Sequence, residues 1–421
     1  MGITQIGYRK DLCADRLSFT HSALEGETFM TTHVIGRWFH FAVLFVAATL
    51  ASCATTAPPE TRFCESSELL VDSSFEGGRF YSCTIDVENE VSIVIHPEDE
   101  PPINPSPWYS FRISSKLATN VEIKLAFVNG YARYWPKVSA DGENWLPMAD
   151  ESVRVSEDGQ SLSISMRLEH TPMWISAQEL VLPSFYSEWL RQLSMHPEVV
   201  TQALGRSVQG RPIYVAKTQT RPEAIILIGR QHPPEVSGAL AMKSFVNTIM
   251  SDSKLANDFR NRYSIIMIPL INPDGVVLGH WRHNINGVDL NRDWGPFTQP
   301  ETQSVARLLS AMERTDINLR LMLDFHSTKS SLFYTQLPDD SNESADFATV
   351  WLSRSRKRLP DFEFKHDPRP PSGQANTKNF FHSHYGIPAI TYELGDEVDR
   401  EEIAATTPVF AEEMMRLLLE R

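Results

Sequence analysis

The sequence predicts two folded units, an all-β sandwich followed by an α/β region whose mixed sheet is mostly parallel. The chain has 421 residues, which is long for a single hydrophobic core. Residues 65–182 contain short alternating runs separated by turn signals, as expected of a β-sandwich. Residues 183–421 alternate continuous apolar runs with helical segments, which is typical of a largely parallel sheet flanked by helices.

The start of the chain, residues 1–53, is interpreted as an export segment. The apolar run Trp38–Leu50 is about a dozen residues long, short of the ~20 that span a bilayer, so it is typical of a signal-peptide core. The sequence Leu50-Ala51-Ser52-Cys53 resembles a bacterial lipobox. We therefore expect export, with Cys53 lipidated and anchored to a membrane on its periplasmic side. A buried strand that ends in cysteine is the alternative.

Two short segments flank this export signal. Residues 1–29 resemble no export element and are interpreted as an extension from a misplaced start. Residues 54–64 are small and Pro-rich, which suits a linker to the β-sandwich at 65–182.

The four cysteines agree with export. Cys13 and Cys53 fall outside or at the edge of the mature chain, which leaves Cys64 and Cys83 as the internal pair. In an oxidising compartment these two could form a disulfide, whereas two unrelated buried thiols are the alternative.

The β-sandwich is predicted from strand-length runs bounded by turn residues. Turn signals such as Asn129-Gly130 and Asp158-Gly159 separate these runs. The clearest predicted strands are Val91–Ile95, Trp108–Ile113, Val121–Phe127 and Leu162–Leu168.

In the α/β region, apolar runs without alternation predict strands that helices cover on both faces. Strands are predicted at Pro212–Lys217, Ala224–Ile228, Tyr263–Ile271, Leu319–Phe325 and Ala389–Tyr392. Helices are predicted at Phe185–Ser194, Pro197–Leu204, Val236–Ser251, Pro300–Arg314, Asp346–Arg358 and Thr407–Leu419, and a loop at Asp367–Gly373.

Polar side chains follow the predicted strands, where sites form in open parallel sheets. His232 and Glu235 follow the predicted strand Ala224–Ile228, His326 follows Leu319–Phe325, and Glu393 stands at the end of Ala389–Tyr392. Two imidazoles and one carboxylate would suit a catalytic zinc ion with one open position, and Glu393 would suit a general base. A chance His–Glu spacing and a buried acid paired with arginine are the alternatives. Asp396, Glu397 and Asp399 are predicted to form a solvated acidic turn.

A cluster of cations and amides lies at residues 280–294. Arg282, Asn291 and Arg292 crowd one predicted loop, and guanidinium groups there could bind a carboxylate. Surface arginines without such a role are the alternative. The formal charge of −14 argues against a nucleic-acid partner, because phosphate binding needs clustered Lys and Arg.

The ordered motifs HPPE, NPDG, WRHN, GVDLNRDW, FHS and TYELGDE resemble the zinc metallocarboxypeptidases of the M14 type. The resemblance implies a carboxypeptidase-like fold and one Zn²⁺ ion held by His232, Glu235 and His326. It also implies that Glu393 is the catalytic glutamate.

The same resemblance assigns roles to the basic cluster. Arg282 matches the arginine that polarises the scissile carbonyl, while Asn291 and Arg292 match the pair that grips the terminal carboxylate of a peptide. The family usually supplies a tyrosine that closes over the substrate, but the corresponding stretch here is RPPSGQANTK, and Tyr385 is only a substitute closer to Glu393. Lys378 lies near the position of the side-chain selector and would attract an acidic residue. An exposed loop lysine is the alternative.

The β region, with PWYSFRI and DGENW, is similar to the N-terminal domain of the cytosolic-carboxypeptidase branch, which includes deglutamylases. We therefore expect hydrolysis of C-terminal residues, acidic ones included, from peptides with a free carboxylate. A muropeptide peptidase or amidase, a deacylase and a non-catalytic peptide-binding lipoprotein are the alternatives.

Overall fold

The computed structural model describes residues 61–337, 343–370 and 372–421. These described residues belong to one compact unit, in which we distinguish the β region (61–182) and the α/β region (183 to the end of the described residues). The predicted export segment and the lipobox residue Cys53 lie outside the described residues. Within the described ranges, none of the helices combines the length and apolar character needed to cross a membrane.

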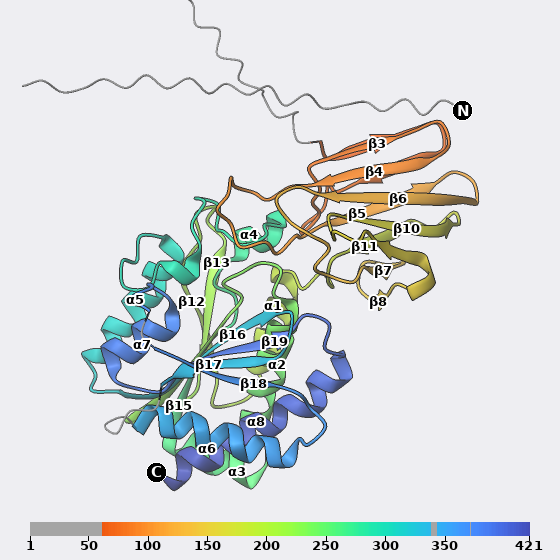
Figure 1. Cartoon of the computed structure of the whole chain (residues 1–421). Coiled ribbons are helices and arrows are strands. Elements are labelled where there is room, and N and C mark those ends of the chain that lie inside the picture. Colours follow the sequence, from red (N-terminus) through yellow and green to blue (C-terminus); the bar gives the residue numbers. More distant parts are fainter. Residues whose placement is uncertain (1–60, 338–342, 371) are drawn as a thin grey trace, which may run out of the picture. The chain divides into compact units, whose positions relative to one another are not determined.

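The β region contains two sheets that pack around one core, as the alternating sequence predicts (Figure 1). One sheet has the order β1 (Phe63–Glu65), β2 (Leu69–Asp72), β5 (Ser110–Ser115), β11 (Met173–Ser176), β7 (Lys137–Ser139) and β8 (Leu146–Pro147). The other has the order β3 (Ser82–Ile85), β4 (Glu90–Ile95), β6 (Thr119–Phe127), β10 (Ser161–Leu168) and β9 (Val153–Val155).

Strand β6 shows why this sequence forms a sandwich. Val121, Ile123 and Leu125 are buried, whereas Glu122 and Lys124 between them remain partly or fully exposed. One face of each strand therefore joins the core and the other meets water, because successive side chains point to opposite faces.

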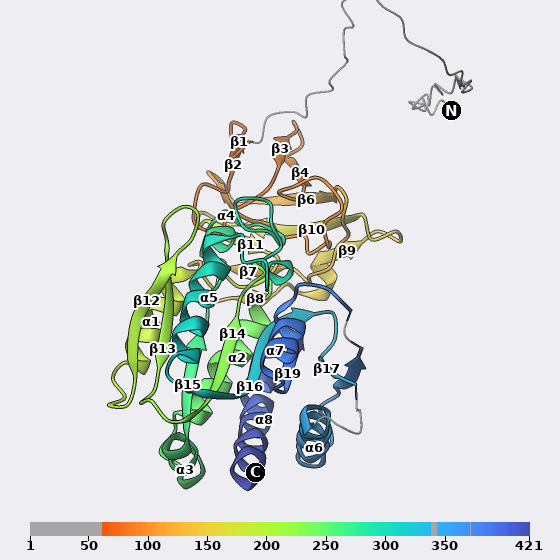
Figure 2. The same ribbon diagram turned by 90° about the vertical axis from the view of Figure 1, so that its left-hand side faces the viewer.

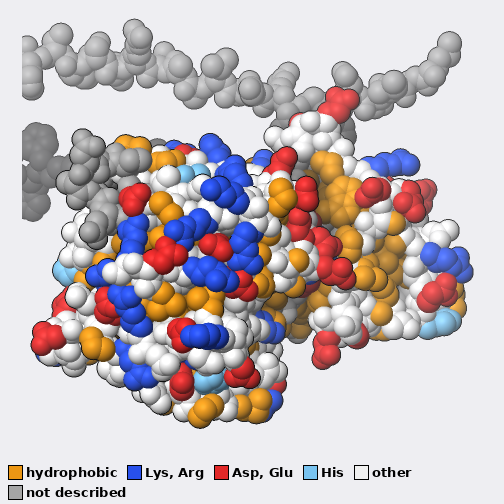
Figure 3. Space-filling model, turned by 90° about the horizontal axis from the view of Figure 1, so that it is seen from below, with side chains coloured by type: hydrophobic (Ala, Val, Ile, Leu, Met, Phe, Trp, Pro, Cys, Tyr) orange, Lys and Arg blue, Asp and Glu red, His pale blue; other side chains and the backbone are white. Residues whose placement is uncertain are grey.

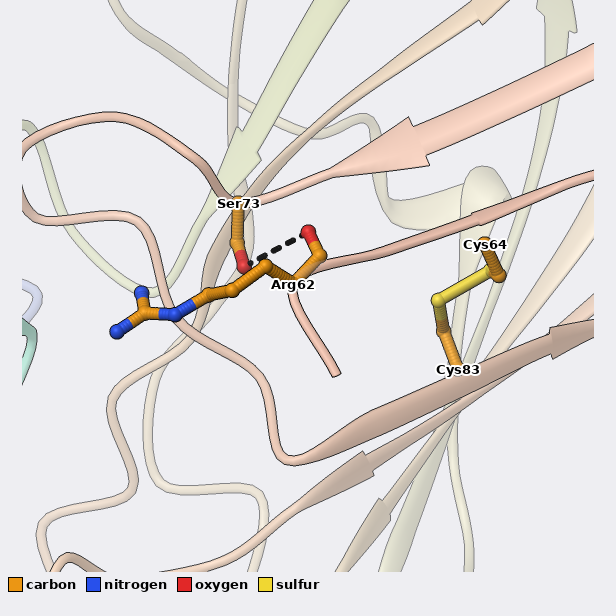
Figure 4. Close-up of a disulfide and its surroundings, with 4 residues drawn as sticks. All are labelled: Arg62, Cys64, Ser73 and Cys83. Atoms are coloured by element: carbon orange, nitrogen blue, oxygen red, sulfur yellow. Dashed lines mark hydrogen bonds between the residues drawn. A yellow bond between two sulfur atoms is a disulfide. The ribbon is translucent and has the colours of Figure 1, made fainter. Parts of the chain in front are cut away.

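A disulfide bond between Cys64 and Cys83 joins β1 of one sheet to β3 of the other (Figure 4). Close to it, the hydroxyl of Ser73 donates a hydrogen bond of 3.3 Å to the backbone oxygen of Arg62. A crosslink over 19 residues is worth about 3 kcal/mol in the chain-entropy account. The bond fixes the first strand of the described chain to the sandwich.

The α/β region is built on one eight-stranded mixed sheet. Its order is β12 (Val200–Arg206), β13 (Pro212–Lys217), β15 (Tyr263–Ile268), β14 (Glu223–Gly229), β16 (Asn318–Thr328), β19 (Ala389–Gly395), β17 (Leu332–Gln336) and β18 (Lys365–Arg369). The central pairs β15–β14, β14–β16 and β16–β19 are parallel, while β12, β13 and β17 join through antiparallel pairs.

Helices cover both faces of this sheet, and Figure 1 shows α5 and α7 on one side and α1 and α2 on the other. In Figure 2, α5 and α7 lie toward the viewer. The helices are α1 (Pro183–Leu193), α2 (Val236–Ile249), α3 (Lys254–Arg262), α4 (Pro273–Leu278), α5 (Pro300–Glu313), α6 (Glu343–Arg358), α7 (Thr377–Tyr385) and α8 (Arg400–Glu420).

Strand β14 explains the continuous apolar run. Ile225 and Leu227 pack in the core that contains α2 and α8, whereas Ile226 and Ile228 pack in the core that contains α5 and α7. A strand buried on both faces needs apolar residues at every position. The predicted fold class is therefore confirmed.

Two local predictions are wrong. Pro197–Leu204 is not a helix, because Val200–Arg206 forms the edge strand β12, which pairs with β13 and exposes much of its surface. The predicted loop at Asp367–Gly373 begins in strand β18, which pairs with β17. In both cases pairing with a neighbouring strand decides the structure, and an edge strand carries little hydrophobic period of its own.

Charge is unevenly distributed on the described surface. On the face seen in Figure 3, Lys and Arg side chains gather toward the left, interleaved with acidic ones. At the α6–α8 contact, Arg354 pairs with Glu420 and Arg358 with Glu413. Neighbouring carboxylates thus offset part of the local positive charge.

Candidate active site

The residues that the motifs single out surround one cavity of about 450 Å³ beside the carboxyl ends of the parallel strands. Its lining includes His232, Glu235, Arg282, Asn291, Arg292, His326, Lys378 and Glu393. His232 and Glu393, which are 161 positions apart in the sequence, therefore contribute to the same cavity.

The three predicted ligands converge at the centre of this cavity. His232 Nδ1 lies 2.8 Å from Glu235 Oε1, and His326 Nδ1 lies 2.7 Å from Glu235 Oε2. All three side chains are buried, and one ligand atom from each lies within 4.8 Å of the other two.

The local backbone explains this convergence. His232 and Glu235 occupy the turn between β14 and α2, where Pro233 and Pro234 restrict the chain before the helix begins. Helix α2 then packs directly against β16. The approach is so close that a Cβ atom added at Gly238 would overlap the backbone oxygen of His326. Only glycine permits this approach.

Two aspartates hold the outer nitrogens of the imidazoles. Asp289 Oδ1 lies 3.0 Å from His232 Nε2, and Asp324 Oδ2 lies 2.8 Å from His326 Nε2. Carboxylates that accept from one ring nitrogen fix the tautomer and leave the other nitrogen free to bind a metal. The donor set and its support thus fit a Zn²⁺ ion held by His232, Glu235 and His326.

Glu393 lies at the same edge of the sheet, paired in register with His326. Its Oε2 atom is buried and has no hydrogen-bond partner among the described residues. Burial raises the pKa of this carboxyl to about 7, the nearby His326 opposing the rise and Glu235 adding to it. An unpaired carboxylate that faces a metal-ligand set is available to exchange protons with a substrate or water.

The basic cluster is also assembled here. Arg282 is buried and its Nε donates to Asp289 Oδ2 at 2.7 Å. Asn291 accepts from both the backbone nitrogen and the hydroxyl of Thr377, each at 3.0 Å. Arg292 is exposed at the cavity, with Nη1 donating to the backbone oxygen of Asn291.

Lys378 is not the exposed loop lysine of the alternative reading. It lies in the first turn of α7, is 7% exposed and lines the cavity. Tyr385 instead donates to Glu313 at 2.7 Å and is not among the cavity-lining residues, whereas Tyr334 is. The substitute that the sequence offered for the closing tyrosine therefore lies elsewhere.

The predicted solvated turn after Glu393 is wrong for Asp396. Asp396 is buried and pairs with Arg133 of the β region, from Arg133 Nε to Oδ2 at 2.8 Å. Arg133 also donates to the backbone oxygen of Ser327, next to His326, at 3.2 Å. The β region thus reaches the edge of the cavity.

Sequence reasoning missed Asp289, Asp324 and Arg133. Asp324 stands two residues before His326 on one strand, so the period of two places both on one face and could have indicated it. Asp289 stands inside the GVDLNRDW motif. For Arg133, no local pattern relates it to residues so distant in the chain.

The fold is an α/β sheet covered by helices, and its site combines two histidines and one glutamate as metal ligands with a second, unpaired glutamate. These features define a class of metalloenzymes that bind a single metal ion. The chain belongs to the zinc carboxypeptidase family, whose profile matches residues 186–401. Residues 71–177 match the cytosolic carboxypeptidase N-terminal domain.

Two curated relatives illustrate the similarity. Cytosolic carboxypeptidase 2 of Xenopus tropicalis is 32% identical over 145 residues, which cover 31% of this chain and 15% of that protein. Cytosolic carboxypeptidase 3 of Mus musculus is 24% identical over 306 residues, which cover 63% of this chain and 30% of that protein. The matched segment is thus less than a third of the length of either relative.

Among solved structures, a metallo-carboxypeptidase from Burkholderia cenocepacia is similar in fold. Its TM-score is 0.71 at 19% sequence identity, over 84% of this chain and 99% of that chain. At this identity the likeness supports the fold alone, and it extends across both the β region and the α/β region.

Proposed function

We propose that the protein is a zinc-dependent carboxypeptidase that removes C-terminal residues from peptides and prefers acidic ones. The observation that carries this proposal is the meeting of His232, Glu235 and His326 with the unpaired carboxylate of Glu393 in one cavity.

The chemistry that a zinc ion supplies when bound in such a site is Lewis acidity toward water and toward a carbonyl oxygen. In the proposed reaction Glu393 removes a proton from the attacking water and returns it to the leaving amine. Arg282 donates to the oxyanion that forms at the scissile carbonyl. Asn291 and Arg292 bind the terminal carboxylate, which restricts cleavage to the end of a chain.

A preference for acidic residues is supported by the charge of the cavity wall. The Nζ atom of Lys378 donates to a neutral acceptor, Asn379 Oδ1, at 3.3 Å, and Lys378 makes no ion pair within the described part of the chain. Arg369 also lines the cavity, although it is exposed and pairs with Asp367. A buried ammonium without a counter-ion favours a carboxylate in the substrate.

The test is mass spectrometry of a panel incubated with the zinc-loaded protein. The panel contains peptides that end in Glu, Gln, Lys or Leu, and muropeptides, which represent the alternative substrate class. We expect single-residue losses from peptides that end in Glu. Glu393→Gln should abolish them while bound zinc, measured by elemental analysis, stays at the wild-type level. Glu157→Gln, an exposed change in the β region, is the matched control.

Cleavage of muropeptides alone would contradict the peptide assignment, and full turnover by Glu393→Gln would contradict the role of the base. Lys378→Met should lower the ratio of kcat/KM for Glu over Gln by about ten- to hundredfold, because a hydrogen bond to a charged group is worth roughly 1.5–3 kcal/mol. Lys357→Met, on the exposed face of α6, should leave the ratio unchanged.

We also propose that the protein is exported and anchored by a lipid on Cys53. The disulfide between Cys64 and Cys83 supports an oxidising compartment. Fractionation tests the anchor: wild-type protein should sediment with membranes and Cys53→Ser should not. A wild-type protein found in the soluble fraction would contradict lipidation.

A further inference from the structure

One carboxylate of the β region binds three backbone amides of the loop that carries Arg282. Glu98 follows strand β4, 184 residues before Arg282 in the sequence. Its Oε1 accepts from the backbone nitrogens of Arg282 and His283, at 2.8 and 2.7 Å, and its Oε2 accepts from that of Trp281 at 2.7 Å.

These three consecutive amides point to one side of the loop, and no backbone oxygen in the described ranges accepts from them. Glu98 therefore satisfies donors that would otherwise be unpaired near the protein interior, where an unpaired amide is costly. Burial opposes ionisation of Glu98, but the charge of His280 and the amide donors lower the pKa of its carboxyl below the usual value.

Neighbouring contacts fix the same loop to the β region. The indole of Trp281 is fully buried, and a Cβ atom at Gly130 would lie 2.9 Å from its ring. His283 Nδ1 lies 2.7 Å from Asp99. Glu98, Asp99 and His283 lie close enough to suggest a second metal site, but Glu98 already accepts three amide hydrogen bonds, so the cluster is explained without an ion.

We propose that Glu98 is a positioning residue for catalysis, which orients Arg282 through the backbone amides of residues 281–283. This role rests on the proposed function of Arg282 as the donor to the oxyanion. In this arrangement the β region is part of the catalytic centre, because the position of a transition-state donor depends on a carboxylate outside the α/β region. Small displacements of such a donor are expensive, since misplacement by about 1 Å can cost roughly a hundredfold in rate.

The first experiment tests the contact itself and needs no activity. Amide hydrogen exchange of the full chain should become faster at residues 281–283 in Glu98→Gln, because the amide side chain loses one acceptor atom and the negative charge. Glu100→Gln, an exposed change two residues away, should leave exchange there unchanged. Unchanged exchange in folded Glu98→Gln would overturn the proposal.

The second experiment tests the route through Arg282. With an N-acylated dipeptide that ends in glutamate as substrate, Glu98→Gln should lower kcat by about tenfold or more and leave KM within about twofold. The same change in an Arg282→Lys background should lower kcat much less, because the effects of two substitutions that act through one interaction are not additive. A general loss of folding would lower kcat by the same factor in the wild-type and Arg282→Lys backgrounds.

An equal loss of kcat in both backgrounds would overturn the proposal. If Glu98→Gln does not fold, Glu98→Asp keeps the charge but shortens the reach and allows the same comparisons. If the wild type cleaves no peptide, the proposed function fails, and the exchange experiment still decides whether Glu98 holds the loop.

Discussion

At the scale of single residues, charge in the cavity is divided between groups that are neutralised and groups that are not. Asp289 interacts with both His232 and Arg282, and Asp324 accepts from Gln231 while it supports His326. Lys378 has no such charged partner within the described residues. A buried charge without a counter-ion is the one most able to discriminate among substrates.

This environment gives the substrate preference a predictable dependence on pH. Burial and the nearby Arg369 both lower the pKa of Lys378 below that of an ordinary lysine. The ammonium is present below its pKa and disappears as pH rises through it, so the attraction for a carboxylate is lost at a lower pH than for an ordinary lysine. We expect the ratio of kcat/KM for peptides ending in Glu over Gln to fall between pH 7 and 10.

Cleavage of both substrates depends equally on bound zinc and on the protonation of Glu393. The effects of pH on these two groups therefore cancel in the ratio of kcat/KM. In Lys378→Met the ratio should be low and independent of pH. A wild-type ratio that stays constant to pH 10 would show that Lys378 keeps its proton over this range or does not select the side chain.

At the scale of elements, the contact between α2 and β16 determines where His326 lies. Gly238 brings the helix against the strand, and its backbone nitrogen donates to the hydroxyl of Ser327 at 2.8 Å. Ser237 contacts the same hydroxyl at 2.9 Å. The β14–α2 turn supplies His232 and Glu235, and strand β16 supplies His326. These two segments are therefore linked through helix α2 as well as through the pairing of their strands.

We predict that Gly238→Ala destabilises the protein and weakens zinc binding. The added methyl group would overlap the backbone of His326, so the helix or the strand must shift, and overpacking of this kind costs typically 1–3 kcal/mol. Thermal unfolding and zinc titration measure the two effects. Asn247→Ala, on the exposed side of α2, is the control, and a variant with wild-type stability and zinc affinity would contradict the proposed tight contact.

At the scale of the whole molecule, the local chemistry was predictable and the contacts between regions were not. His232, Glu235, His326 and Glu393 each follow or end a buried strand, and the hydrophobic pattern of those strands reveals which ends meet. The strand and helix types of the central sheet follow from the same pattern. These are short-range signals.

Contacts across long sequence separations have no such signal. Glu98 and Arg133 look like ordinary surface residues of a β-sandwich, yet they bond to residues 184 and 263 positions away. The edge strand β12 was mistaken for a helix for a related reason, since pairing with β13 and not its own period defines it.

The β region and the α/β region share a polar interface around the turn that follows Glu393. Arg133 pairs with Asp396, and their side chains are only 6% and 4% exposed. Lys137 lies 2.5 Å from Glu397. Arg400, at the start of α8, pairs with Glu179 of the β region at 2.7 Å. The turn is therefore held on several sides.

We predict that this interface makes the two regions unfold together and that Arg133 dominates it. Arg133→Met leaves Asp396 buried without its partner, and breaking a buried pair in this way costs about 3–5 kcal/mol. Replacing both partners, as in Arg133→Met with Asp396→Leu, should recover much of the loss, because two apolar side chains remove both desolvation costs. Arg154→Met, at an exposed position of β9, should change the free energy of unfolding by no more than about 0.5 kcal/mol. Denaturant unfolding of the four proteins, followed by tryptophan fluorescence, measures the series; a single variant as stable as the wild type, or a double variant less stable than the single one, would contradict this account of the interface.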